Sequence, residues 1–325
     1  MKYRRLGNTN ISVSEIGFGA WGISGEKPNL KAYGPKDDRT SLLALDTALD
    51  KGITFYDTAS SYGAGHSENL IGKAFRFKRN KIVIATKGGY LNTFNPNGLN
   101  QDFSPQGIQK SLEESLVRLK TNYIDLYQIH DCPLSKMNED TFNLLIKLKS
   151  KGILRSIGFA GKSPDDTLKI LDNYKFDVIQ VNFNLTDMRC ICNGLFKKCY
   201  DSNIGIIVRT PLVFGYLTGE INDETIFHHS DHRSRFSKEQ IKKWLSVWDF
   251  YHDSLNFCKH YTKTQKALCF CLSFNEVSVI NVGMSNKNHV IENIYNISLD
   301  KFSNEHLTKC INDYNRNYSN MVLPK

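Results

Sequence analysis

Short apolar segments alternate along the chain with longer segments in which apolar residues recur every three or four positions. The short segments are rich in Ile, Val, Phe and Tyr, which is typical of strands in a parallel sheet that is covered on both faces. We therefore predict strands at residues 14–20, 54–59, 81–87, 124–130, 156–160, 178–183, 205–210 and 278–283.

The intervals between these segments have helical spacing. Residues 41–50 place leucines on one stripe and end at a Lys-Gly pair, which is a helix stop signal. Residues 142–148 precede a second such pair, and Ser-Pro pairs at 104–105 and 163–164 predict the first turns of two further helices. Predicted strands and helices thus follow one another in strict alternation.

This alternation predicts an α/β protein with a closed (β/α)₈ TIM barrel, which needs about 250 residues plus insertions. An open, doubly wound sheet is the competing architecture, but it rarely keeps eight regular units in one domain. No linker or composition break divides the chain, so we expect a single barrel domain over residues 1–325. The intervals 23–39, 88–103 and 214–236 follow strands and exceed ordinary loops, which places them at the C-terminal mouth of the barrel.

Composition and charge narrow the classes of partner. The net charge of +9 is spread along the chain without a dense basic block, so it suits a phosphorylated ligand and does not point to nucleic acid. No stretch is apolar for long enough to span a bilayer, and no apolar run follows the N-terminal basic residues, so we expect neither a membrane segment nor a secretory signal. The eight cysteines are interpreted as free thiols of a cytoplasmic protein.

Four chemically complementary side chains fall at or just after the ends of consecutive predicted strands: Asp57, Tyr62, Lys87 and His130. Reduction of a carbonyl needs a hydride donor and an acid that protonates the forming alkoxide. A phenol has a pKa of about 10, and a nearby ammonium lowers that value. We expect Lys87 to tune Tyr62 and Asp57 to hold Lys87, while His130 orients the substrate oxygen or assists the proton transfer; no metal is needed.

The chain resembles the aldo-keto reductase family in five segments, GFGAWG (17–22), FYDTASSYG (55–63), IATKGG (84–89), IDLYQIHD (124–131) and IQVNFN (179–184). The resemblance extends from YRRLGNT near the start to NVGMSNKNHVIEN at 281–293. It implies a (β/α)₈ barrel, with a short N-terminal hairpin capping the barrel bottom, that binds NADPH, less often NADH, without a Rossmann fold.

Position by position, the resemblance assigns roles to individual residues. It implies that Asp57, Tyr62, Lys87 and His130 are the catalytic tetrad. Gln180 would contact the nicotinamide carboxamide, and Arg209 would lie against the nicotinamide in place of the aromatic ring that the family often has. The other implied cofactor contacts are Thr210 and Leu212, with Gly283, Met284, Asn286, Lys287, His289, Glu292 and Asn293 around the adenosine; Trp21 and Tyr90 would contact the substrate.

Two positions depart from the pattern of the family. Many members have a Ser-Asn pair after the fifth strand, where this chain has Ala160 and Gly161, so a usual carboxamide contact is missing or made by the backbone. His289 stands where many members place an arginine for the 2′-phosphate. Lys287 or Asn286 would then take that role, and we expect NADPH over NADH.

Three other patterns are given structural interpretations. The glycines at 17, 19 and 22 match a dinucleotide-binding fingerprint, but a loop with two prolines follows instead of a helix. The histidine-rich segment 228–232 is expected to be a solvated loop rather than a metal site. Trp244 and Trp248 have helical spacing and are expected to form a buried or interface stripe of one helix.

Together these observations predict an NAD(P)-dependent oxidoreductase that acts on a small carbonyl or alcohol, such as an aldehyde or a sugar. A cofactor-binding regulatory or sensor barrel with little turnover is the alternative, and a Rossmann dehydrogenase is the third hypothesis. The sequence leaves the substrate, the direction of the reaction and the oligomeric state open.

Overall fold

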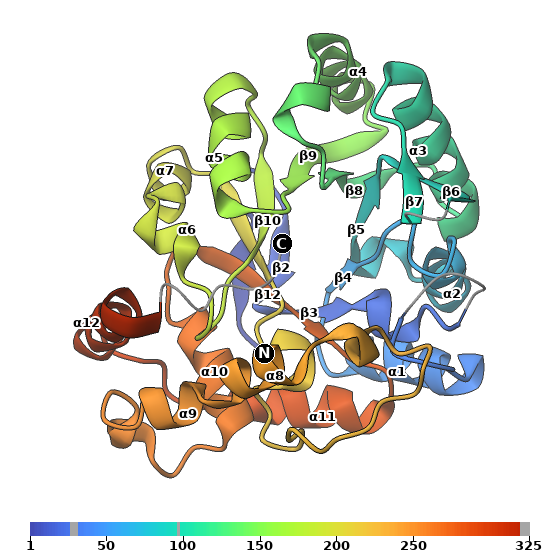
Figure 1. The fold of residues 1–325 in the computed structure, drawn as a ribbon. Helices are drawn as coiled ribbons and strands as arrows, with labels where there is room; N and C mark the ends of the chain where they lie inside the picture. The colour runs from blue at the N-terminus through green and yellow to red at the C-terminus, as the bar shows by residue number, and fades with distance from the viewer. Residues whose placement is uncertain (27–31, 96–97, 319–325) are drawn as a thin grey trace.

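The computed structural model describes residues 1–26, 32–95 and 98–318. Within these residues, eight parallel strands close into a barrel in the order β10-β11-β12-β3-β4-β5-β8-β9, which confirms the predicted architecture (Figure 1). The barrel strands are β3 (Ile16–Gly19), β4 (Phe55–Asp57), β5 (Val83–Gly88), β8 (Ile124–His130), β9 (Leu154–Ala160), β10 (Val178–Asn182), β11 (Gly205–Arg209) and β12 (Val277–Gly283).

Helices surround the strands (Figure 1). The Ser-Pro pairs begin helices as predicted, because the hydroxyls of Ser104 and Ser163 accept hydrogen bonds from the first-turn amides of α3 and α5. No helix of the described ranges is both long and apolar enough to cross a membrane. The α-helices are α1 (Asp38–Asp50), α2 (His66–Phe75), α3 (Pro105–Leu119), α4 (Glu139–Ser150), α5 (Pro164–Asn173), α6 (Arg189–Cys192), α7 (Leu195–Asp201), α8 (Lys238–Leu245), α9 (Val247–Phe250), α10 (Lys263–Leu272), α11 (Lys287–Asn296) and α12 (Asn304–Asp313).

A hairpin of β1 (Tyr3–Arg5) and β2 (Ser12–Ser14) closes the bottom of the barrel, as the family resemblance implied. The guanidinium of Arg4 donates hydrogen bonds to the carbonyls of Leu272 and Val277, at 2.6 and 2.5 Å. Apolar residues of the hairpin fill the barrel interior in a second core cluster: Leu6, Ile11 and Val13 with Phe55, Val83, Ala85, Leu126, Val178, Ile207 and Val279.

The sequence left one local structure open, and one expectation about local structure is wrong. The interval 88–103 contains an antiparallel hairpin, β6 (Tyr90–Asn95) and β7 (Gly98–Gln101), which its mostly polar sequence did not reveal. Trp244 and Trp248 lie on two short helices, α8 and α9, because the helix is interrupted at Ser246. Trp244 is nevertheless fully buried, in keeping with a core role.

Candidate active site

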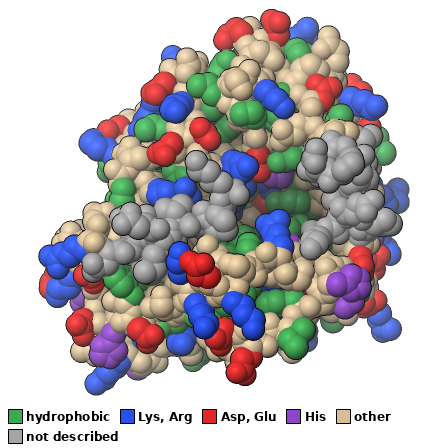
Figure 2. Space-filling model, in the orientation of Figure 1, with side chains coloured by type: hydrophobic (Ala, Val, Ile, Leu, Met, Phe, Trp, Pro, Cys, Tyr) green, Lys and Arg blue, Asp and Glu red, His purple; other side chains and the backbone are tan. Residues whose placement is uncertain are grey.

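Lys87 is the centre of a cluster at the C-terminal mouth of the barrel. Its Nζ atom lies 2.5 Å from Oδ1 of Asp57, 2.8 Å from the carbonyl oxygen of Thr58 and 3.3 Å from the hydroxyl oxygen of Tyr62. Asp57 ends β4, Lys87 lies in β5 and Tyr62 lies in the loop that leads to α2. The strand ends thus bring these three side chains together, as the spacing predicted, and Figure 2 shows a hollow near the centre of this face.

Burial and charge act in opposite directions on this cluster. Burial raises the pKa of the Tyr62 phenol above its ordinary value of 10, although the charges of Lys87 and Arg209 act to lower it. The expectation of a net lowering is therefore wrong, because desolvation of the phenolate outweighs the ammonium. Burial also lowers the pKa of Lys87, but Asp57 and Tyr62 outweigh burial and hold that pKa above its usual value. Lys87 is a permanent cation here.

His130 ends β8 and faces the same hollow. The centre of its ring lies 6.2 Å from that of Tyr62 and 4.9 Å from that of Tyr90. Burial lowers the pKa of His130 to about 4, and the cations Lys87 and Arg209 act in the same direction. The imidazole is therefore neutral at pH 7, where it can donate a hydrogen bond from one ring nitrogen.

The second carboxylate oxygen of Asp57 is held by amides from the barrel interior. Gln180 donates from Nε2 at 2.7 Å and Gln128 at 3.4 Å. The amide nitrogen of Gln180 is thus bonded to Asp57. The implied contact of Gln180 with the nicotinamide carboxamide stays a prediction, and it would use the side-chain carbonyl oxygen. Sequence reasoning did not single out Gln128, although it lies in the quoted segment 124–131.

Arg209, at the end of β11, is fixed by two oxygen acceptors. Its Nε donates to Oδ1 of Asn182 at 3.0 Å, and its Nη2 donates to the carbonyl of Gly161 at 2.8 Å. A Cβ atom at position 161 would lie 1.9 Å from Oγ1 of Thr167, so the side chain of Thr167 occupies the space that a larger residue would need. In place of a side-chain amide, the backbone carbonyl of Gly161 here holds the guanidinium of Arg209.

The residues implied for the cofactor border the same mouth. Thr210 follows Arg209 and donates to Oδ1 of Asn182, and Leu212 packs on the core beside it. Gly283 ends β12, and a Cβ atom there would meet nothing within 4 Å. These and the following residues lie between the mouth and the first turns of α11: Met284 and Asn293 are buried, whereas Lys287, His289 and Glu292 are exposed.

The start of α11 suits a phosphate-bearing cofactor. Oδ1 of Asn286 accepts a hydrogen bond from the backbone N–H of His289 at 2.9 Å and so caps the helix. The amides of the first two helical positions have no intrahelical partner, and a helix N-terminus favours anions. Together with the open space over Gly283, these donors fit a dinucleotide.

Trp21 and Tyr90, the two expected substrate contacts, lie on either side of the cluster. The ring centre of Trp21 is 6.2 Å from that of Tyr62. Trp21 also packs on His232, at 4.4 Å, and Nδ1 of His232 contacts the carbonyl of Ala32 at 3.1 Å. The expectation that the segment 228–232 is a solvated loop is therefore wrong at Ser230, Asp231 and His232, which are buried.

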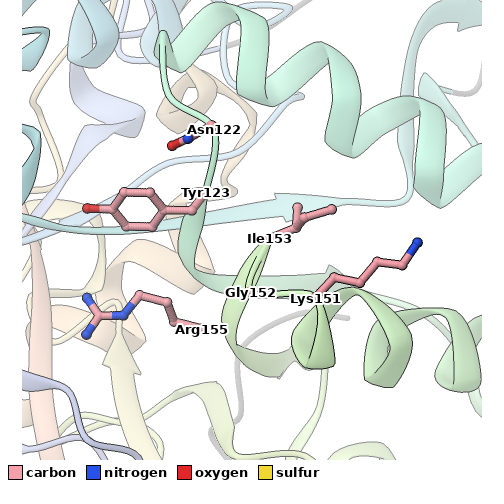
Figure 3. Close-up of a pocket in the computed structure, with 6 residues that line it drawn as sticks. All are labelled: Asn122, Tyr123, Lys151, Gly152, Ile153 and Arg155. Carbon is pink, nitrogen blue, oxygen red and sulfur yellow. The ribbon is translucent and has the colours of Figure 1, made fainter.

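Three other candidate sites in the described residues lack the features of a functional site. A hollow of about 490 Å³ at the opposite end of the barrel is lined by residues at the starts of β8 and β9 (Figure 3). Its Arg155 is paired with the buried Asp125 at 2.7 Å, and no acid–base pair points into it. In the described parts of the chain, no three His, Cys, Asp or Glu side chains gather as a metal site. The glycines at 17, 19 and 22 lead into a single 3₁₀ turn, Ala20–Ile23, and not into the α-helix of a Rossmann fold.

The sequence profile of the Aldo/keto reductase family matches residues 15–312. The chain belongs to the aldo/keto reductase family. This family comprises oxidoreductases that use nicotinamide cofactors. The NADH-specific methylglyoxal reductase of Escherichia coli is 30% identical over 319 residues, which cover 92% of this chain and 94% of that protein.

Other relatives of this aldo-keto reductase differ in the substrates that they are named for. The L-galactose dehydrogenase of Arabidopsis thaliana is 29% identical over 308 residues, covering 90% of this chain and 87% of that protein. The glycerol dehydrogenase of Gluconobacter oxydans has a solved structure that aligns with a TM-score of 0.80 and 25% identity, covering 99% and 98% of the two chains. The family is therefore shared while the named substrates vary.

Proposed function

We propose that this aldo-keto reductase transfers hydride between a nicotinamide cofactor and a small carbonyl compound or alcohol, with Tyr62 as the general acid and base. One observation carries the proposal: Nζ of the buried Lys87 lies between the carboxylate of Asp57 and the hydroxyl of Tyr62, at 2.5 and 3.3 Å. A phenol held beside a buried ammonium at the mouth of a barrel can pass its proton to a substrate oxygen, because the ammonium stabilises the phenolate that forms.

The proton transfer follows from these contacts. When bound, the nicotinamide cofactor supplies or accepts the hydride. In the reductive direction, Tyr62 donates its hydroxyl proton to the substrate oxygen, and the ammonium of Lys87 stabilises the phenolate that remains. Asp57 keeps Lys87 in place, and the neutral imidazole of His130 donates a hydrogen bond to the same substrate oxygen.

The rim residues would hold the cofactor. Arg209 would face the nicotinamide and the N-terminus of α11 would bind phosphate, with Gly283 leaving room for close approach. We propose NADPH as the preferred cofactor, with Lys287 as the exposed cation nearest the helix start. Relatives include an NADH-specific enzyme and a Schizosaccharomyces pombe aldo-keto reductase named for NADP(+), so the family alone does not decide this preference.

The substrate that we propose is a small, oxygen-rich aldehyde or sugar. The named substrates of the relatives, methylglyoxal, L-galactose and glycerol, share that character. In this chain the mouth combines aromatic walls, Trp21 and Tyr90, with charged groups at the floor, which suits a small polar molecule.

The test mixes pure protein with NADPH or NADH and a panel of aldehydes and aldoses, and follows the absorbance of the reduced cofactor. Turnover of at least one class, with a lower KM for NADPH than for NADH, is expected. Lys287→Ala should raise the Kd for NADPH, measured by protein fluorescence, and leave that for NADH unchanged; Lys309→Ala on α12 is the matched control. A single turnover with tight retention of oxidised cofactor would support the sensor alternative instead.

We also propose a cytoplasmic location. All eight cysteines are free thiols, and all but Cys192 are buried. Burial raises the pKa of the Cys271 thiol and keeps it protonated. Proteins of reducing compartments keep such thiols, and cell fractionation followed by immunoblotting tests the location.

A further inference from the structure

Asp131 places a carboxylate at the mouth that the proton transfer described above does not use. It follows His130 at the end of β8, and its backbone N–H donates to the carbonyl of Ala160 at 2.8 Å. Its φ angle is +52°, in the left-handed region that few residues other than glycine adopt. Such conformations persist where the surrounding structure imposes them, and they concentrate at functional sites.

The contacts of Asp131 are numerous but long. Its Oδ2 lies 3.4 Å from the hydroxyl of Tyr90 and 3.9 Å from Nε2 of His130. Its Oδ1 lies 3.5 Å from Nη2 of Arg209. Charge-assisted hydrogen bonds are about 2.7–2.9 Å long, so none of the three is a full bond.

Asp57 shows the contrast within the same site. Both of its oxygens have partners at 2.5 and 2.7 Å, and its side chain is 1% exposed. The side chain of Asp131 is 18% exposed. A carboxylate has about four acceptor positions, so Asp131 keeps acceptor capacity for a ligand that enters the mouth.

Asp131 is also ionised. Burial would raise the pKa of its carboxyl group, but the neighbouring cations Arg209, Lys162 and Lys87 outweigh burial, so the pKa lies below its ordinary value. An ionised carboxylate accepts hydrogen bonds and donates none. It therefore attracts hydroxyl groups and repels carboxylates and phosphates at the same place.

The location of Asp131 decides which hydroxyl it can reach. In the proposed function, the reacting oxygen lies between the hydroxyl of Tyr62 and the imidazole of His130, and we take Nε2 as the donating nitrogen. Oδ2 of Asp131 is 3.9 Å from Nε2 of His130. A hydroxyl on the carbon next to the reacting carbon is therefore the substituent that comes within its reach.

We propose that Asp131 is a specificity-determining residue that accepts a hydrogen bond from a hydroxyl adjacent to the reacting carbonyl, so that the site favours α-hydroxy aldehydes and sugars over simple aldehydes. This inference rests on the proposed function for the placement of the reacting oxygen. A simple alkyl chain would leave the carboxylate without that donor.

Glyceraldehyde and propanal test the proposal, because both have three carbons and they differ in hydroxyl groups. We expect wild-type protein to have a higher kcat/KM for glyceraldehyde, and Asp131→Ala to reduce the ratio of the two kcat/KM values about tenfold or more. Asp131→Asn should have an intermediate ratio, because the amide oxygen accepts a hydrogen bond without the charge. Equal losses for both aldehydes in Asp131→Ala would overturn the proposal.

A second variant separates direct recognition from an effect through Arg209. Asn182→Ala removes the partner of Arg209 Nε and leaves Asp131 in place. If Asn182→Ala reproduced the change in the substrate ratio, Asp131 would act by positioning the guanidinium, and the proposal would be wrong. A ratio that stays like wild type in Asn182→Ala supports the direct contact.

Equilibrium binding keeps the proposal testable apart from turnover. Calorimetry compares 1,2-propanediol with 1-propanol on the protein saturated with cofactor. Tighter binding of the diol that disappears in Asp131→Ala supports the contact, even if no aldehyde is reduced and the proposed function fails. Equal binding of the two alcohols to wild-type protein would count against it, whatever the turnover.

Discussion

The amine nitrogen of Lys87 lies 3.3 Å from the hydroxyl oxygen of Tyr62. These residues are 25 positions apart and come from different βα units. The lysine is fully buried, and among the described residues Asp57, 2.5 Å away, is its only anionic neighbour at bonding distance. The contact thus joins a permanent cation to a phenol. Replacing Tyr62 tests its catalytic role, and replacing Lys87 tests its structural role.

Tyr62→Phe removes the proposed acid and leaves the ring. We expect kcat for aldehyde reduction to fall by about 10²–10⁴-fold, the usual contribution of a general acid, while the Kd of NADPH changes little. Steady-state kinetics and fluorescence titration measure the two quantities. Tyr200→Phe, at an exposed tyrosine of α7, is the matched control and should behave as wild type. An active Tyr62→Phe protein would refute the assignment of the acid.

Lys87→Met leaves Asp57 buried without its cation. Breaking one partner of a buried pair costs about 3–5 kcal/mol, so the free energy of unfolding in urea should drop by that order and activity should be lost. The double variant with Asp57→Asn removes the uncompensated charge and should recover much of the stability but none of the activity. Recovery of activity in the double variant would show that the ammonium is dispensable.

Most of the fold could be predicted from the sequence because barrel strands and helices have strong local patterns. Strand β8 has the predicted bounds of 124–130, and the starts of α3 and α5 follow from Ser-Pro pairs. The hairpin β6–β7 lacked such a pattern, because its residues are mostly polar. The local sequence pattern thus predicts strands and helices where apolar residues are regularly spaced.

The sequence predicted which residues form the site, but it did not predict the direction in which the pKa of Tyr62 is shifted. Strand ends meet at one rim, so the proximity of Asp57, Lys87 and His130 followed from topology. The net direction of the pKa of Tyr62 did not, because it depends on how strongly the folded chain desolvates the phenol. The burial of His232 also escaped sequence reasoning, since it depends on a contact with Ala32, 200 positions away.

Protonation of His232 should weaken the fold in acid. Burial lowers its pKa from 6.5 to about 4, although its contact with Ala32 and the charge of Asp231 act to raise it. The unfolded chain then binds a proton near pH 6.5 while the folded chain does not, so the free energy of unfolding falls as the pH drops from 6.5 to 4. The contribution of this group is on the order of 2–3 kcal/mol at pH 4.

Urea unfolding at several pH values measures this effect. His232→Phe should reduce the fall between pH 6.5 and 4, since phenylalanine suits the aromatic surroundings and does not titrate; the buried His130, with a pKa of about 4, accounts for a fall that remains. His252→Phe, at an exposed histidine, should keep the wild-type slope. Identical slopes in all three proteins would show that His232 is not responsible.

Gly161→Ala should destabilise the protein mainly through a steric clash with Thr167. The added Cβ would lie 1.9 Å from Oγ1 of Thr167, and overpacking of this kind costs about 1–3 kcal/mol. Adding Thr167→Ala removes that oxygen and should restore most of the loss. Thermal unfolding of the single and double variants measures both changes, and an unchanged melting temperature in Gly161→Ala would contradict the packing argument.

The hydrogen bonds of Arg4 at the base of the barrel join the beginning of the chain to its last barrel strand. Arg4 bonds to carbonyls of Leu272 and Val277, which lie 268 and 273 positions further along the chain. During synthesis the hairpin β1–β2 therefore lacks these partners until nearly the whole polypeptide has been made. Contacts over such separations form slowly because a long loop has to close first. Val277, at the start of the last barrel strand, thus holds Arg4 of the first hairpin in place.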